Sequence, residues 1–242
     1  MMNLIYVFLP SVVAGIIQST TGFGSGVFMM LFFPLFMDML PAAGLSCLIS
    51  LACNTNLVMR YRKHIQVKST LWPLVIFFIV SFCAVKLALV LPVSSLKAYF
   101  GLFLVGLAIY FVFFSDRIQI QGGPLSIIVC SVLSGLGSGF FGISGPPMVI
   151  YFLAMAGDDK KKYIGTIQFF FMITGLYVTT VRILEGVVTW TLLWPLIAGA
   201  IGIVLGNIIG TRILDRINVT VMKKLIYIFL ALSGTVTFLS NI

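Results

Sequence analysis

Two segments of the chain place flexible backbone and hydroxyl groups inside apolar surroundings, and this combination could bind an anion. They are residues 14–36 (AGIIQSTTGFGSGVFMMLFFPLF) and 134–156 (SGLGSGFFGISGPPMVIYFLAMA) in a chain of 242 residues. Glycine lets a ligand approach the backbone closely, and a hydroxyl donates a hydrogen bond without the cost of burying a charge. The free N–H groups at the start of a helix favour negative charge. If each segment folds as two helices joined by a tip, we expect an anion site at the tips.

The candidate ligands are the small polar residues of the two tips and three amide side chains near them. They are Gln18, Ser19, Thr20, Thr21, Gly22, Gly24, Ser25 and Gly26 in the first segment, Ser138, Gly139, Gly142, Ser144, Gly145 and Pro146 in the second, and Asn54 and Gln168 on the helices that follow. Proline suits the first turn of a helix, where no N–H group is needed. Close helix packing by small residues, and hydrogen bonds between helices, are the alternative explanation.

Composition places the chain in a membrane. Hydrophobic residues make up 60% of it and charged residues 9%, and apolar runs of about 20 residues recur along it. We therefore expect an integral membrane protein with one transmembrane domain, residues 1–242. No basic residue precedes the first apolar run, so that segment is expected to be retained rather than cleaved as a signal peptide. The net charge of +9 is interpreted as membrane topology and not as nucleic-acid binding.

No cluster of residues in the sequence favours catalysis or metal binding. The single histidine, His64, lies in a basic loop, and no HExxH motif, Ser–His–Asp set or buried acid is found. The four cysteines lie in apolar segments, where packing is their expected role: Cys47, Cys53, Cys83 and Cys130. We predict that the protein is not an enzyme and has no cofactor or metal.

The pattern of apolar segments repeats once along the chain. The first glycine-rich segment, about 4–40, precedes apolar helices near 42–59, 70–91 and 98–114, and the second, about 125–156, precedes helices near 164–181, 191–211 and 225–240. The sequence LWPL at 71–74 recurs at 193–196. We predict an all-α, polytopic membrane protein of about eight hydrophobic segments with internal repeats at about 1–115 and 124–242. Each repeat would contain a glycine-rich helical hairpin and three spanning helices, as is typical of secondary transporters.

Loop charges predict that the two repeats are inserted in opposite orientations. The loop at 60–68 carries four basic residues, whereas its counterpart has Arg182 balanced by Glu185. The loop at 157–163 carries three lysines, whereas its counterpart carries Asp38 alone. Because Lys and Arg collect in cytoplasmic loops, equivalent loops lie on opposite sides of the membrane. The loops expected to be cytoplasmic are 60–68, 115–124, 157–163 and 212–224, with both termini on the other side.

Segment length favours hairpins that enter the membrane without crossing it. Each arm of the first segment, at 4–17 and 27–40, has 14 residues, or about 21 Å of helix, against a hydrocarbon core of about 30 Å. We expect two re-entrant hairpins that enter from opposite faces and meet near the midplane among six spanning helices. Two full crossings per segment remain the alternative.

The placement of charged residues bears on the mechanism. All six acidic residues lie in loops or at segment ends: Asp38, Asp116, Asp158, Asp159, Glu185 and Asp215. No carboxylate is therefore expected at the midplane to couple transport to protons or sodium. An anion would move down its own gradient or be driven by the membrane potential. Lys86 is expected to extend to the interface, and the alternative is that it supplies positive potential to an anion route. Arg182 is expected to anchor a helix boundary at the interface.

The glycine motifs resemble those of a known family. GFGSG at 22–26 and GISGPP at 142–147 each open a repeat of about 120 residues, and in this they resemble the sulfite exporter TauE/SafE family over essentially the whole chain. Ser25 and Ser144 stand where glycine is common in that family, and Pro146 and Pro147 replace part of the second glycine run. The resemblance implies a membrane permease that exports or takes up sulfite, sulfonates or other organic anions.

Two alternatives to a sulfur-anion permease stay open on the sequence alone. One is a transporter of another organic anion, and the other is a membrane scaffold that transports nothing. The expected partners are a small anionic substrate, the lipid bilayer of the cell membrane and a second copy of the chain in a homodimer. Anion flux separates the permease from the scaffold.

Overall fold

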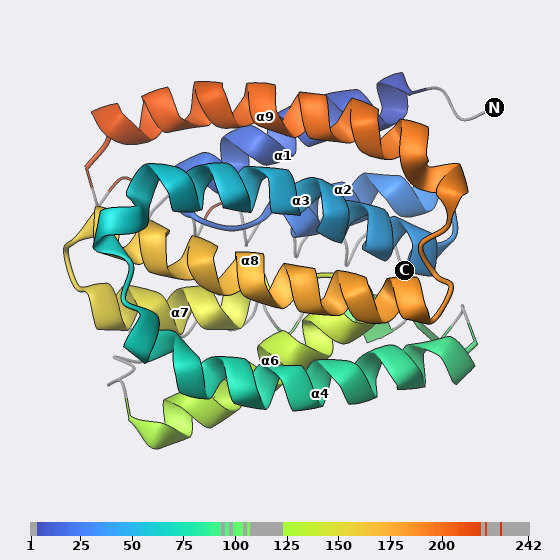
Figure 1. The fold of residues 1–242 in the computed structure, drawn as a ribbon, viewed down its shortest axis with the longest axis horizontal. Coiled ribbons are helices and arrows are strands. Elements are labelled where there is room, and N and C mark those ends of the chain that lie inside the picture. The colour runs from blue at the N-terminus through green and yellow to red at the C-terminus, as the bar shows by residue number, and fades with distance from the viewer. Residues whose placement is uncertain are drawn as a thin grey trace.

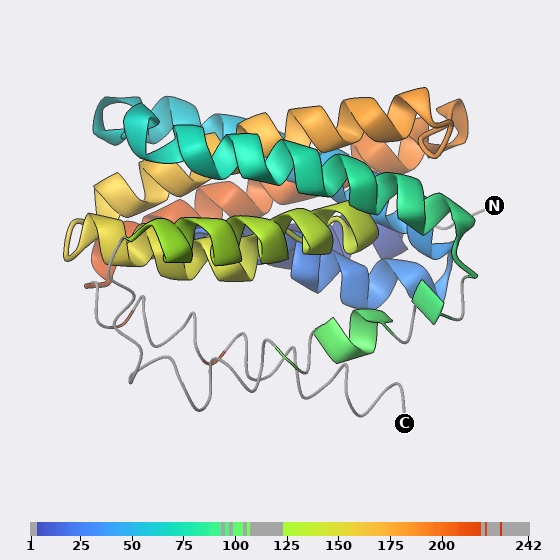
Figure 2. The ribbon, with the colours of Figure 1, turned by 90° about the horizontal axis from the view of Figure 1, so that it is seen from below.

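The structure is a bundle of helices, as the apolar pattern predicts. It is a computed structural model that describes residues 4–92, 95–96, 99–103, 106, 123–218, 221 and 228, and every regular element in these residues is helical. The long helices follow the long axis of the molecule in both views (Figure 1, Figure 2). Most of the expected helices at 98–114 and 225–240 lie outside the described residues.

The helices follow the order that the sequence predicts. The first half contains α1 (Ile5–Thr21), α2 (Ser25–Phe32), the 3₁₀ turn η1 (Phe33–Leu35), α3 (Met39–Tyr61), η2 (Arg62–His64), η3 (Val67–Thr70) and α4 (Leu71–Val90). The second half contains α6 (Pro124–Phe141), α7 (Gly145–Ala156), α8 (Lys160–Leu184), η4 (Trp190–Leu192) and α9 (Leu193–Arg216). In the described part of the chain, five helical segments are long and apolar enough to cross a membrane: Met39–His64, Val67–Val90, Pro124–Phe141, Lys160–Leu184 and Trp190–Arg216.

Glycines in the left-handed conformation end the first helix of each glycine-rich segment. Gly22 (φ 86°) ends α1 and Gly142 (φ 73°) ends α6, and Gly24 (φ 104°) precedes α2. Residues with a side chain rarely adopt such angles, which explains why glycine is found at these positions.

The predicted arm lengths are wrong for the first segment, because α1 has 17 residues and α2 has eight before η1. The helix continues to residue 21, and the Thr21 hydroxyl donates to the Ile17 carbonyl within it at 2.7 Å.

Glycines also bring α1 into direct contact with α9. Gly202, Gly206 and Gly210 lie on one face of α9, against the backbone of α1. A Cβ atom on Gly202 would lie 2.6 Å from the Phe8 carbonyl oxygen, and one on Gly210 would lie 2.7 Å from that of Ile16. The contacting residue numbers increase in the same direction along α1 and α9, so the two helices run parallel. Their backbones are as close as small residues permit.

The same kind of contact joins α6 to α4. A Cβ atom on Gly135 would lie 3.0 Å from the side chain of Val80, and one on Gly139 would lie 2.8 Å from the Ser81 carbonyl oxygen. These helices also run parallel. The antiparallel helices α3 and α8 lie between the two glycine-packed pairs (Figure 1). The fold thus places α3 and α8 where their side chains can reach both glycine-rich segments.

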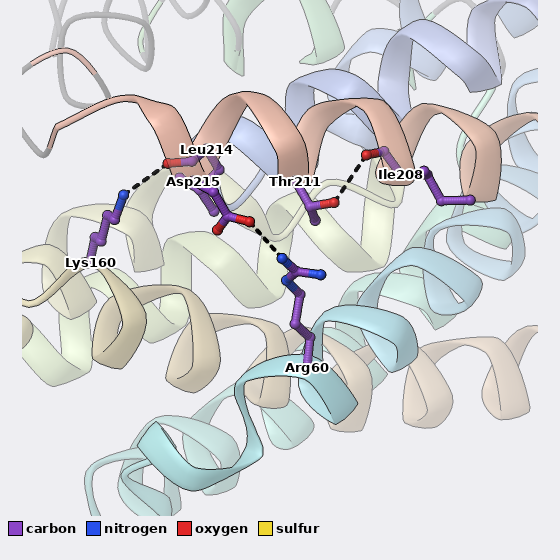
Figure 3. Close-up of polar contacts among 6 residues, drawn as sticks. All are labelled: Arg60, Lys160, Ile208, Thr211, Leu214 and Asp215. Carbon is purple, nitrogen blue, oxygen red and sulfur yellow. Dashed lines mark hydrogen bonds and ion pairs between the residues drawn. The ribbon is translucent and has the colours of Figure 1, made fainter.

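Three basic loops meet at one end of the molecule. Arg60 at the end of α3 pairs with Asp215 of α9 at 2.6 Å, and Lys160 Nζ donates to the carbonyl oxygen of Leu214 at 2.8 Å (Figure 3). Lys160 Nζ also donates to the carbonyl oxygen of Ile217 at 2.9 Å. These contacts bring together the loops at 60–68 and 157–163 and the described part of 212–224.

The opposite end carries its own ion pair. Lys86 of α4, which the sequence predicts at the interface or beside an anion route, pairs with Glu185 after α8 at 2.6 Å. The lysine side chain is half exposed. Its charge is therefore matched by an acid from the other half of the chain.

The glycine face of α9 generates a prediction about stability. Gly206→Leu should lower the free energy of unfolding by about 1–3 kcal/mol, because its side chain would overlap the backbone of Val12. Thermal unfolding in detergent measures the effect. The control is Ile208→Phe, which adds volume on the exposed side of the same helix and should change stability little. Equal stability of the two variants would contradict the packing of α1 on α9.

Candidate functional site

The two glycine-rich breaks enclose one cavity. It has a volume of about 40 Å³, the space of about one water molecule. A Cβ atom on Gly26 would lie 3.0 Å from the Gly142 carbonyl oxygen, so the two breaks are in contact. Helices α3 and α8 complete the walls. The lining residues are Gln18, Gly24, Ser25, Gly26, Val27, Cys47, Ser50, Asn54, Ser138, Gly142, Ile143, Ser144, Gly145, Phe171 and Gly175.

Two helix N-termini open onto this cavity. Helix α2 begins at Ser25 and α7 begins at Gly145, and both residues line the cavity. The first N–H groups of a helix have no partner within it. The Ser25 N–H donates to Gln18 Oε1 at 3.2 Å, which leaves the amides of Gly26 and Gly145 as donors for a ligand. Pro146 lies in the first turn of α7, as the sequence predicts, but does not line the cavity.

Three amide side chains form one network beside the first break. Gln18 Nε2 donates to Asn54 Oδ1 and, at 3.1 Å, to Gln168 Oε1. Gln168 Nε2 donates in turn to the Gly22 carbonyl oxygen at 2.6 Å. Gln18 and Asn54 reach the cavity, whereas Gln168 lies behind them. Gln168 therefore positions the first break and its amides.

The hydroxyl of Ser50 lines the cavity but was not predicted from the sequence. Ser50 Oγ of α3 lies 2.8 Å from Ser25 Oγ, which also donates to Gln18 Oε1. Ser50 and Asn54 are four residues apart and therefore lie on one helix face, and this spacing could have predicted Ser50. Cys47 of the same helix was likewise expected only to pack, yet it lines the cavity.

Several predicted ligands lie away from the cavity. The hydroxyls of Ser19 and Thr20 donate to the carbonyls of Gly15 (2.6 Å) and Ile16 (2.8 Å) within α1, so these residues belong to the end of one helix and not to the start of the next. Gly139 packs against α4. The predicted residues that do not line the cavity are Ser19, Thr20, Thr21, Gly22, Gly139, Pro146 and Gln168.

Arg182 is not the interfacial anchor that the sequence predicts. Its side chain is buried, with 1% of the residue surface exposed. Nη2 donates to the carbonyl oxygens of Ser138 and Gly139 at 3.0 Å each, near the end of α6. Since Ser138 also lines the cavity, a guanidinium group lies directly behind the cavity wall.

The chemistry of the cavity suits a small anion. Its walls provide backbone N–H groups, serine hydroxyls and side-chain amides, and no Asp or Glu is among the lining residues. Neutral donors stabilise negative charge without themselves requiring a counter-ion. Helix N-termini add positive partial charge.

The family comparison agrees with this chemistry. The family model described as "Sulfite exporter TauE/SafE" matches residues 7–237, nearly the whole chain. No curated protein and no solved structure matches the chain. The match confirms the resemblance carried by the two glycine motifs, and the apolar helices agree with a multi-pass membrane protein. The chain therefore belongs to the sulfite exporter TauE/SafE family of membrane transport proteins.

Proposed function

We propose that the protein moves a small anion, a sulfur oxyanion such as sulfite or an organosulfonate, through the cavity at the two glycine-rich breaks. The observation that carries the proposal is the convergence of the α2 and α7 N-termini on one cavity without a carboxylate. Substrate would contact the amides of Gly26 and Gly145 and the hydroxyls of Ser25 and Ser50. With no acid in the wall to carry a coupling cation, the anion moves with its gradient and the membrane potential.

The proposed architecture is an inverted repeat. The support is that the first helix of each half packs on a helix of the other half. Helix α1 packs parallel to α9, and α6 packs parallel to α4. A pseudo-two-fold axis in the membrane plane that relates α1 to α6 would also relate α9 to α4. The start of α6 lies at the basic end and that of α1 at the other (Figure 1). The two segments would then enter from opposite faces.

Within this architecture the glycine-rich segments are proposed to be re-entrant. Their second arms support this, because α2 has eight residues and α7 has 12, or about 12 and 18 Å of helix. Neither length reaches across a hydrocarbon core of about 30 Å. The cavity at the breaks would then lie near the midplane, accessible from either side by small rearrangements.

The direct test of the proposed function is anion flux in proteoliposomes. Sulfite, thiosulfate, sulfate, a sulfonate and a small carboxylate are compared under an imposed membrane potential. We expect flux of at least one sulfur oxyanion or sulfonate, faster when the loaded compartment is negative. Absence of flux for every anion would reject the proposal and favour the scaffold alternative.

The hydroxyl pair of the cavity generates a second prediction. The double variant Ser25→Ala, Ser50→Ala removes two hydroxyls from the cavity wall and should raise the KM for the transported anion by about tenfold, which corresponds to about 1.4 kcal/mol. The control is Ser69→Ala, whose hydroxyl bonds to the Gln66 carbonyl in an exposed loop. An unchanged KM in the double variant would place substrate elsewhere.

The proposed orientation is tested by labelling single cysteines. Lys63 in η2 and Lys161 in the first turn of α8 are exposed at the basic end, and Thr189 is exposed at the other end, so each is replaced by cysteine. In right-side-out vesicles an impermeant maleimide should label Thr189→Cys and leave the first two unlabelled, because basic loops stay in the cytoplasm. Labelling of the two lysine positions from opposite sides would contradict both the fold and the inverted repeat.

A further inference from the structure

We infer that Arg182 supplies the positive charge that makes this site select anions. The inference rests on the proposed function and assigns the sign and affinity of the site to a residue outside the cavity wall. Arg182 is a positioning residue in this role, because it acts through the carbonyl oxygens of Ser138 and Gly139 and through its electric field.

At a helix–break–helix tip, the end of the first helix weakens the preference of the second helix for anions. The second helix presents N–H groups with positive partial charge, but the first helix ends beside it with carbonyl groups of negative partial charge. The two ends oppose each other at the cavity. Donors that cover the carbonyl groups of the first helix therefore strengthen the field that favours an anion.

Helix α8 provides such donors at both breaks. At the first break, Tyr163 Oη donates to the Thr21 carbonyl oxygen at 3.0 Å and Gln168 Nε2 donates to that of Gly22 at 2.6 Å. At the second break, Arg182 donates to two carbonyl oxygens from one end of its guanidinium group. The donors at the first break are neutral, whereas the donor at the second carries a full charge.

The charge of Arg182 lacks a partner acid in the described part of the chain. The nearest acid along α8, Glu185, pairs with Lys86. Arg182 Nε has no hydrogen-bond acceptor among the described residues. A buried cation without a counter-ion is costly, and charged residues inside membranes mark functional sites. An anion in the cavity would complete the charge balance.

Substitution of Arg182 separates the charge from the hydrogen bonds. Arg182→Gln keeps an amide donor but loses the charge, and Arg182→Lys keeps the charge. In the flux assay with sulfite we expect Arg182→Gln to raise KM by about tenfold or more, a loss of about 1.4 kcal/mol. Arg182→Lys should stay closer to the wild-type KM. The control is Arg62→Gln, which removes an exposed arginine and should leave flux unchanged.

A second pair of variants tests the charge without altering Arg182. Cys47 lines the cavity, and its Sγ lies 3.7 Å from the Gly142 carbonyl oxygen at the second break. Cys47→Asp places a negative charge in the cavity, and Cys47→Asn has the same shape without the charge. We expect sulfite flux of Cys47→Asp to fall at least about tenfold below that of Cys47→Asn, because the carboxylate would take the place of the anion as the counter-charge. This pair remains informative if Arg182→Gln fails to fold.

The outcomes distinguish this inference from the proposed function. Wild-type protein that moves none of the anions rejects the proposed function itself. Wild-type flux together with equal KM values for Arg182→Gln and wild type, or equal flux of the two Cys47 variants, overturns the role of Arg182. A fall in kcat that is the same for Arg182→Gln and Arg182→Lys, without a change in KM, would assign Arg182 a structural role only and also overturn the inference.

Discussion

The need to pair every backbone polar group away from water governs this structure. In a hydrocarbon core an unpaired N–H or C=O group costs several kcal/mol, so a helix can break only where other groups of the protein replace its hydrogen bonds. Both breaks here meet that condition. The N–H of Gly22 still reaches the Gln18 carbonyl at 2.8 Å, and side chains of α8 donate to the carbonyl oxygens of Gly22 and Gly139 at the two helix ends. What stays uncovered is the pair of N-termini that faces the cavity.

Glycine packing determines which helices can provide these replacements. Because α9 lies directly on α1, and α4 on α6, each glycine-rich segment has one side sealed by backbone contact. Its other side turns toward α3 and α8, whose polar side chains form the amide network and the carbonyl contacts. A single helix, α8, reaches the first break with Gln168 and the second with Arg182. Its position therefore links the two halves of the site.

The ion pairs at the two ends of the molecule also join helices from different halves of the chain. Arg60 of α3 pairs with Asp215 of α9, and Glu185 after α8 pairs with Lys86 of α4. In the proposed inverted repeat, α3 corresponds to α8 and α9 to α4, so the two pairs join corresponding helices with their charge signs exchanged. Each pair ties the helix beside the cavity to a glycine-packed helix of the other half.

The sequence by itself determined the helical class, the apolar segments and the two positions where helices must break, because composition and glycine act locally. It also predicted the family through the glycine motifs, which the family match confirms. Tertiary structure decided which polar residues face the cavity. Ser19 and Thr20 turned back to their own helix, since a hydroxyl can bond one turn earlier, while Ser50 joined the wall because α3 passes beside the first break. Arg182 looked like a boundary residue from its position near a helix end, yet its burial depends on carbonyls 43 and 44 residues away in the chain. Such contacts follow from how helices pack, and no local pattern encodes them.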